Sequence, residues 1–245
     1  MDYKTMDANE AVSRVSYKFT EIAGIYPITP ASPMAEKVDV LASKGEINFW
    51  GNKVKVIEME SEKGAIATVH GALQAGVLAT TYTASQGLLL MIPSIYKMAG
   101  EMLPGVIHVA ARSLSTHSLS IFGDHQDIYA VRQTGACMLS SSSVEEAYHM
   151  AMVSHLASIK SSLPFINFFD GFRTSHEIDK VKEIDLSKLE TLIDKKALRK
   201  FRDNGMISGA TTRGTAENED VYFQHTESRN GYYTNCLLYT SDADD

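Results

Sequence analysis

The segment 54–76 constrains the fold of this chain most strongly, because a short strand pattern runs directly into a helix pattern of small residues. In its first part apolar residues alternate with acids, and Glu58, Glu60 and Glu62 recur at every second position. This period is typical of a strand that leaves a core. After Glu62, glycines are interleaved with alanines and other apolar residues, which favours a helix packed closely on a sheet. Glu62 is therefore predicted between a strand and a helix, where open α/β sheets bind ligands.

Strand and helix patterns alternate along the rest of the chain. Strands are predicted at 25–28, 54–59, 78–83, 106–111, 137–139 and 164–170. Helices are predicted from Asp7 or Asn9 to Gly24, from Ser32 or Pro33 to Gly45, at 62–76, at 88–98 with a bend at Pro93, from Ile128, at 143–157, and as an amphipathic surface segment at 185–201. This alternation predicts an α/β fold with a doubly wound, mostly parallel sheet and helices on both faces.

Composition excludes several classes of protein. The 245 residues are 44% hydrophobic and 22% charged, which is enough for one sizeable α/β core. A net charge of -7 argues against a nucleic-acid-binding surface. No apolar run reaches membrane-spanning length and no secretory signal opens the chain, so we expect a cytoplasmic protein. The two cysteines, Cys137 and Cys236, offer no disulfide framework and no iron-sulfur or zinc motif.

Three residues at strand ends are candidate functional groups, each with a structural alternative. Glu62 could complement the helix dipole, or, partly desolvated among small residues, share a proton with a ring nitrogen of a bound heterocycle, as thiamine diphosphate requires. Thr29, between Pro27 and Pro30, could satisfy its own backbone in a turn or contact a ligand. Arg112, after a buried strand, could be a solvated loop residue or a bidentate fork for a small carboxylate.

The long polar connection 113–135 contains possible metal ligands. His117, Asp124, His125 and Asp127 lie within it, but neighbours in sequence need not converge on one ion. A hydrogen-bonded loop, with an Asp capping the helix from Ile128, explains the same polarity. We therefore predict no metal site here, and interpret the connection as a ligand or interface loop.

Six segments taken together resemble a known family: IYPITPAS, IEMESEKGA, TYTASQGLLLMIP, ARSLSTHSLSIFGDHQD, VRQTG and FFDGFRTSHE. Over about residues 8–233 the chain is similar to the N-terminal, thiamine-pyrimidine-binding domain of pyruvate:ferredoxin (flavodoxin) oxidoreductases. The resemblance implies a pyrimidine-type thiamine diphosphate-binding fold. It also implies that Glu62 is the pyrimidine carboxylate, with Pro27 and Ile28 beside the cofactor, and that Thr29 and Arg112 hold the carboxylate of pyruvate.

The activity implied is oxidative decarboxylation of pyruvate, with coenzyme A taking the acetyl group and ferredoxin or flavodoxin taking electrons. Family members are expected to be homodimers when full length. Their Gly-Asp-Gly segment, which binds the diphosphate through Mg²⁺, and their cysteine clusters, which hold [4Fe-4S] centres, are absent from this sequence. The chain therefore resembles a fragment that would be inactive alone. The alternatives are a subunit acting on another 2-oxoacid, such as 2-oxoglutarate, and a non-catalytic docking module.

The expected domain covers residues 1–234, with a core at about 8–203 and an irregular extension at 204–234. The last residues, 235–245, depart from the family pattern and resemble translated sequencing-adapter read-through. A disordered acidic tail is the alternative interpretation of this segment.

Overall fold

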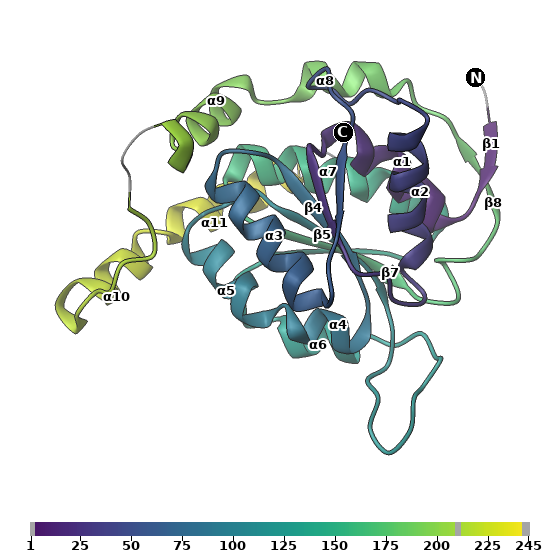
Figure 1. The fold of residues 1–245 in the computed structure, drawn as a ribbon, viewed down its shortest axis with the longest axis horizontal. Coiled ribbons are helices and arrows are strands. Elements are labelled where there is room, and N and C mark those ends of the chain that lie inside the picture. The colour runs from purple at the N-terminus through teal and green to yellow at the C-terminus, as the bar shows by residue number, and fades with distance from the viewer. Residues whose placement is uncertain (1–2, 209–211, 242–245) are drawn as a thin grey trace.

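A six-stranded parallel sheet forms the centre of the computed structural model, which describes residues 3–208 and 212–241 (Figure 1). Its strand order is β3-β2-β4-β5-β7-β6, and every neighbouring pair is parallel. The strands are β2 (Ile22–Ile25), β3 (Lys55–Glu58), β4 (Ala79–Thr83), β5 (Val106–Ala111), β6 (Cys137–Ser141) and β7 (Phe165–Asp170). β4, β5 and the first five residues of β7 are buried, as expected for strands covered on both faces.

Two layers of helices cover this sheet, which confirms the predicted fold class (Figure 1). One layer comprises α1 (Ala8–Phe19), α2 (Ser32–Ser43) and α7 (Val144–Ser161). The other comprises α3 (Glu62–Gln74), α4 (Ser85–Leu90), α5 (Ile92–Gly100) and α6 (Gln126–Val131). Side-chain caps begin three of these helices: the oxygens of Asp7, Ser61 and Ser143 accept hydrogen bonds from the amides of Glu10, Gly64 and Glu146.

Further elements lie outside the two layers. The sequence patterns did not predict the antiparallel pair β1 (Tyr3–Met6) and β8 (Asp179–Lys182). The amphipathic segment forms η1 (Leu186–Lys188), α8 (Leu189–Leu192) and α9 (Lys195–Asp203). The prediction of an irregular extension at 204–234 is wrong, because the short turn η2 (Met206–Ser208) is followed by α10 (Glu219–Glu227) and α11 (Asn230–Ser241). α11 packs against α7, so its helical form depends on tertiary contacts rather than on local amphipathicity.

Three predicted element boundaries are also wrong. The first helix ends at Phe19 rather than Gly24, since the Thr20 hydroxyl and amide both donate to the Ser16 carbonyl and the next residues join the sheet. β2 ends at Ile25, before Tyr26 and the prolines. The bent helix at 88–98 is two helices, because α5 restarts after Met91 with Pro93 in its first turn.

The direction in which successive strands are added to the sheet reverses between β2 and β4. From β2 the chain adds β3 on one side, and then returns to place β4 on the other side. β2 and β4 pair only at Ile22↔Ala79 and Ala23↔Thr80, so their carboxyl ends do not pair with each other. A topological switch of this kind opens a crevice where α/β sheets bind ligands.

Among the described residues, no helix combines the length and the apolar composition needed to cross a membrane.

Candidate active site

Glu62 lies at this switch, in the first turn of α3 and directly after the capping residue Ser61. Only 7% of its surface is exposed. Gly87 of α4 lies directly against it: a Cβ added to Gly87 would be 2.7 Å from Glu62 Cγ and 2.8 Å from Oε1. Both distances are too short for any other residue, so glycine is what allows α4 to approach the carboxylate. The structure therefore places Glu62 between β3 and α3, as the strand-to-helix pattern predicted, and its side chain is enclosed there.

Arg112 follows the last residue of β5 and is 6% exposed. Its Nη1 donates to the carbonyl oxygen of Thr29 at 2.7 Å. Its Nε is buried and has no hydrogen-bond partner among the described residues. Burial lowers the pKa of Arg112, whereas the negative charges of Asp127 and Glu62 act in the opposite direction. A buried guanidinium with an unused N–H in its fork is suited to binding a small carboxylate.

The segment after β2 supplies the third predicted residue, Thr29. Its carbonyl is the acceptor for Arg112, and the Thr29–Pro30 peptide is cis. The Pro30 carbonyl in turn accepts from Nδ2 of the fully buried Asn9 at 3.1 Å. Thr29 itself is exposed, as is Pro27, while Ile28 is partly buried against the core. The structure thus brings Thr29 and Arg112 together, and the contacts of Thr29, Pro27 and Ile28 with a ligand stay predictions.

Sequence reasoning missed Thr83, although it ends β4 at the same crevice. Its hydroxyl is buried without a hydrogen-bond partner among the described residues, and it would be 2.6 Å from a Cβ added to Gly87. A buried hydroxyl that lacks a partner is uncommon and requires an explanation. Thr83 therefore belongs with Glu62 and Gly87 in one small cluster. A β-branched residue in a β-rich run gave no separate signal that it had a role beyond the strand.

The structure also corrects the interpretation of Asp127. We predicted that an Asp in the connection 113–135 caps the next helix, but α6 begins at Gln126 and has no side-chain cap. Asp127 is instead fully buried, and its Oδ2 accepts from the amides of Ser85 at 2.7 Å and Arg112 at 3.0 Å. Its Oδ1 accepts from the Ile128 amide at 2.8 Å. The carboxylate therefore connects the ends of β4 and β5.

The loop between β5 and α6 extends well beyond the rest of the molecule (Figure 1). Leu119, Ile121 and Phe122 are more than half exposed on it, at 66%, 73% and 57%. His125, near its end, has Nε2 2.8 Å from Oδ1 of Asp170. Among the described residues, no group of three or more His, Cys, Asp or Glu side chains could hold a metal ion. Its role as a ligand or interface loop stays a prediction.

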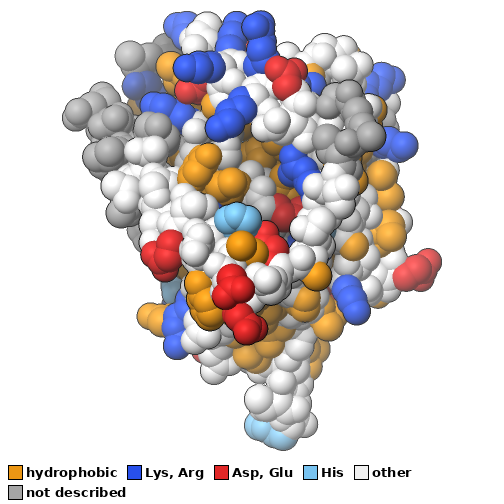
Figure 2. Space-filling model, turned by 90° about the vertical axis from the view of Figure 1, so that its left-hand side faces the viewer, with side chains coloured by type: hydrophobic (Ala, Val, Ile, Leu, Met, Phe, Trp, Pro, Cys, Tyr) orange, Lys and Arg blue, Asp and Glu red, His pale blue; other side chains and the backbone are white. Residues whose placement is uncertain are grey.

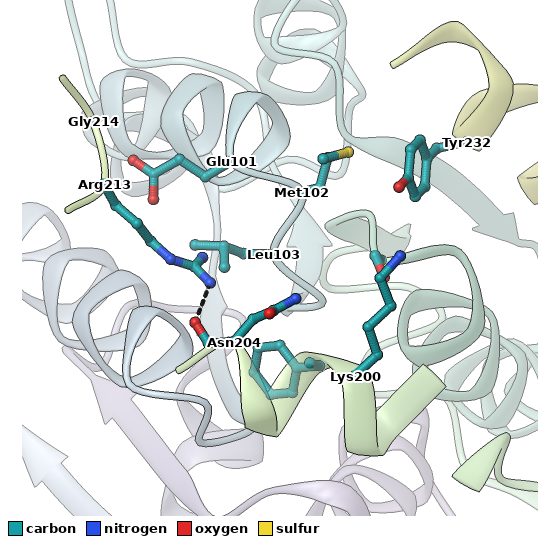
Figure 3. Close-up of a pocket in the computed structure, with 10 residues that line it drawn as sticks. Glu101, Met102, Leu103, Lys200, Asn204, Arg213, Gly214 and Tyr232 are labelled. Atoms are coloured by element: carbon teal, nitrogen blue, oxygen red, sulfur yellow. Dashed lines mark hydrogen bonds between the residues drawn. The ribbon is translucent and has the colours of Figure 1, made fainter. Parts of the chain in front are cut away.

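Three hollows elsewhere in the described part of the molecule do not include the candidate residues. One of about 250 Å³ lies at the amino edge of the sheet, opposite to Glu62, where Arg213 Nη2 donates to the Asn204 carbonyl at 2.6 Å (Figure 3). Figure 2 shows Lys and Arg side chains gathered at the top of one face. The helix α9 is itself rich in basic residues, with Lys195, Lys196, Arg199, Lys200 and Arg202. Among the described residues of these features, no arginine is both buried and left with an N–H that has no hydrogen-bond partner, as Arg112 is. The crevice at the switch is therefore the better candidate site.

A family model described as "Pyruvate flavodoxin/ferredoxin oxidoreductase, thiamine diP-bdg" matches residues 14–244. The chain belongs to this family. It is 58% identical over 231 residues to the pyruvate-flavodoxin oxidoreductase of Klebsiella pneumoniae, covering 94% of this chain and 20% of that protein. It is 55% identical over 234 residues to the pyruvate:ferredoxin oxidoreductase of Moorella thermoacetica, covering 95% and 20%. The chain thus spans about a fifth of the length of these two relatives.

A solved structure of the 2-oxoglutarate:ferredoxin oxidoreductase from Magnetococcus marinus, with 2-oxoglutarate, coenzyme A and succinyl-CoA bound, has the same fold. It matches with a TM-score of 0.66 over 76% of this chain and 32% of the other, at 22% sequence identity. The match to the oxidoreductase family continues into residues 235–244, and α11 extends to Ser241. The non-native origin of the last residues stays a prediction.

Proposed function

We propose that this chain is the N-terminal, thiamine-pyrimidine-binding portion of a pyruvate:ferredoxin or pyruvate:flavodoxin oxidoreductase. The observation that carries the proposal is the convergence of Glu62 and Arg112, which are 7% and 6% exposed, at the switch between β2 and β4. The reaction proposed is conversion of pyruvate to acetyl-CoA and CO₂. Because the matched relatives are about five times longer, we expect the isolated chain to be inactive.

The residues at the crevice fit the pyrimidine half of thiamine diphosphate. When bound, this cofactor supplies the carbon nucleophile and the electron sink for decarboxylation of a 2-oxoacid. Glu62 would hold a proton at a ring nitrogen, where enclosure by Gly87 and Thr83 strengthens the interaction. The unpaired hydroxyl of Thr83 is available to the same ligand. Pro27 and Ile28 would border the cofactor from the segment after β2.

Pyruvate would bind through its carboxylate. Arg112 has its Nε–H free and its Nη1 already bonded to the Thr29 carbonyl, so its plane is fixed before a ligand arrives. Fixing a guanidinium in advance lowers the entropic cost of binding an anion in one orientation. The Thr29 hydroxyl would add a second donor. Arg112 would thus orient the substrate without itself transferring a proton.

The Mg²⁺ and iron-sulfur sites that the reaction needs would lie in parts of the enzyme outside this sequence. The sequence has no Gly-Asp-Gly segment for a diphosphate-bound Mg²⁺, and its two cysteines are too few to ligate a [4Fe-4S] cluster. We therefore propose that Mg²⁺, the clusters, and the contacts with coenzyme A and with ferredoxin or flavodoxin belong to domains beyond this sequence. A homodimeric, cytoplasmic enzyme is part of the same proposal.

The test uses the complete polypeptide, obtained by reading the gene across and beyond the codon for Asn235. Glu62→Gln keeps the size of the side chain but removes its ionisable proton. We expect it to fold, and to abolish deuterium exchange at the reactive carbon of bound thiamine diphosphate. Retained exchange would remove Glu62 from the proposed role.

A second variant tests the substrate contact. Arg112→Lys cannot form a bidentate fork, so the KM for pyruvate should rise at least about tenfold. Arg132→Lys, at an exposed arginine after α6, is the matched control. An unchanged KM in Arg112→Lys contradicts the proposal. A kcat/KM that favours 2-oxoglutarate over pyruvate would support the related 2-oxoacid oxidoreductase instead.

A further inference from the structure

Asp127 holds together two parts of the candidate site that come from different strands. Its Oδ2 accepts two hydrogen bonds, from the Ser85 amide at 2.7 Å and from the Arg112 amide at 3.0 Å. Ser85 follows the end of β4, and Arg112 follows the end of β5. One carboxylate oxygen therefore sets the spacing of two neighbouring strand ends at the edge where the candidate site lies.

The two bonded amides lead to the two halves of the site. Ser85 has a positive φ of 51° and begins α4, which two residues later brings Gly87 against Glu62. On the other side, the backbone of Arg112 is held by Asp127, and its guanidinium is held by the Thr29 carbonyl. The side chain of Arg112 is thus anchored at both ends. Movement of Asp127 would shift Arg112 relative to Glu62.

The cost of burying this carboxylate indicates that its position matters. Asp127 is fully buried, and burial raises its pKa while the amides of Arg112, Ser85 and Ile128 lower it. An exposed cap could satisfy the first amides of α6 without burying a charge. Charge-assisted bonds to backbone amides are short and directional, and they hold a strand end more rigidly than a neutral side chain would.

We propose that Asp127 is a positioning residue, which sets the placement of the Arg112 guanidinium relative to the Glu62–Gly87 contact by joining the ends of β4 and β5. This inference rests on the proposed function, since Arg112 is there the group that binds pyruvate. Asp127 itself touches neither substrate nor cofactor in this scheme. Its effect on the reaction is through the geometry of Arg112.

The first test uses this chain by itself and needs no activity. The amides of Ser85 and Arg112 should exchange with deuterium as slowly as amides inside β5, because each is bonded to a buried carboxylate. Asp127→Asn keeps the shape but removes the charge and one acceptor, and should speed exchange at both amides. Asp194→Asn is the matched control, since Asp194 accepts from the amides of Lys196 and Ala197 at the start of α9. It should speed exchange only there.

The second test is kinetic and uses the complete polypeptide. Asp127→Asn should raise the KM for pyruvate about tenfold or more, because small misplacements of a binding group are costly, while kcat changes far less. Asp194→Asn should lower thermal stability and leave KM unchanged. A purely structural role for Asp127 predicts the control's behaviour for both variants.

The possible results separate the inference from the proposed function. A raised KM in both Arg112→Lys and Asp127→Asn supports both. A raised KM in Arg112→Lys alone overturns the inference and leaves the proposed function standing, whereas an unchanged KM in Arg112→Lys overturns both. If Asp127→Asn does not fold, fast exchange of the Ser85 and Arg112 amides in the unsubstituted chain still overturns the inference, and slow exchange supports it.

Discussion

Two buried histidines predict that this protein loses stability in mild acid. His108 of β5 and His155 of α7 are 0% and 5% exposed, and their Nε2 atoms are 3.1 Å apart. The side-chain Nδ2 of Asn167 lies 3.1 Å from Nδ1 of His108, so this ring nitrogen accepts a hydrogen bond from Asn167. His108 must then carry its proton on Nε2 and donate to His155. One more proton on either ring would leave two donors facing each other or break this chain of bonds.

The magnitude follows from the pKa values. Burial lowers the pKa of His155 from 6.5 to about 3, and burial and the neighbouring His155 lower the pKa of His108 well below its usual value. Both rings are therefore neutral when folded, whereas in the unfolded chain they gain protons below pH 6.5. Their stabilising contribution is complete above pH 6.5 and is lost as the pH falls towards 3. At pH 5 the loss is about 2 kcal/mol for His155 alone, at ~1.4 kcal/mol per pH unit, and the lowered pKa of His108 adds to the loss in the same direction.

The assay is urea unfolding of the chain at pH 7.5, 6.5, 5.5 and 5.0. His155→Phe keeps an aromatic ring against Phe19, whose ring is 4.9 Å away and nearly parallel. At pH 7.5 the variant should be less stable by ~1–3 kcal/mol, because His108 loses its acceptor. Between pH 7.5 and 5.0 it should lose about 2 kcal/mol less stability than the unsubstituted chain. His117→Gln, at an exposed position, should show the unsubstituted pH dependence. Parallel pH curves for the chain and His155→Phe would refute the reasoning.

Three smaller predictions concern glycines and a helix cap. Gly87→Ala should weaken thiamine diphosphate binding by the complete polypeptide, since the new methyl group would collide with Glu62 and Thr83. Binding equal to that of the unsubstituted protein would contradict the need for close contact between Gly87 and these two residues. Gly71→Ala, in α3 with no atom near the added Cβ, should instead stabilise the chain by ~0.5–1 kcal/mol in urea unfolding, and a loss of stability would be inconsistent with the open space there. Ser143→Ala should cost about 1 kcal/mol, because Ser143 caps α7, and Ser118→Ala in the exposed loop is its control.

Much of the sheet could be predicted from local patterns, because buried parallel strands are short apolar runs and the helices between them show caps. The strand at 106–111 and the Ser143 cap are confirmed by β5 and α7. The first helix was predicted too long because Ile22 continues the apolar period of α1. Its bond to the Leu78 carbonyl and its pairing with Lys55 of β3 show that it belongs to the sheet. α10 and α11 lack a clear apolar stripe, so no periodic pattern predicts these two helices.

The site was predictable in its strand-end residues but not in their mutual contacts. Glu62 and Arg112 follow recognisable strands, and parallel strands bring their carboxyl ends to one edge. Thr83, Gly87 and Asp127 matter through neighbours far away in the chain: Asp127 is 42 residues from Ser85. No periodicity encodes such a contact. The local alternative, a helix cap, is therefore favoured whenever an Asp precedes a helix, and here it was wrong.

The burial of Arg112 favours one of the two interpretations that the sequence left open, a solvated loop residue or a bidentate fork for a small carboxylate. A solvated loop arginine would expose its fork to water, but this residue is 6% exposed and has an Nε–H without a partner. Leaving a buried donor unsatisfied costs about 1–3 kcal/mol, and more when the group is charged. That cost is offset if an anion occupies the crevice beside the guanidinium. The Thr29 carbonyl satisfies only Nη1, so a carboxylate that binds Nε would complete the fork without moving the arginine.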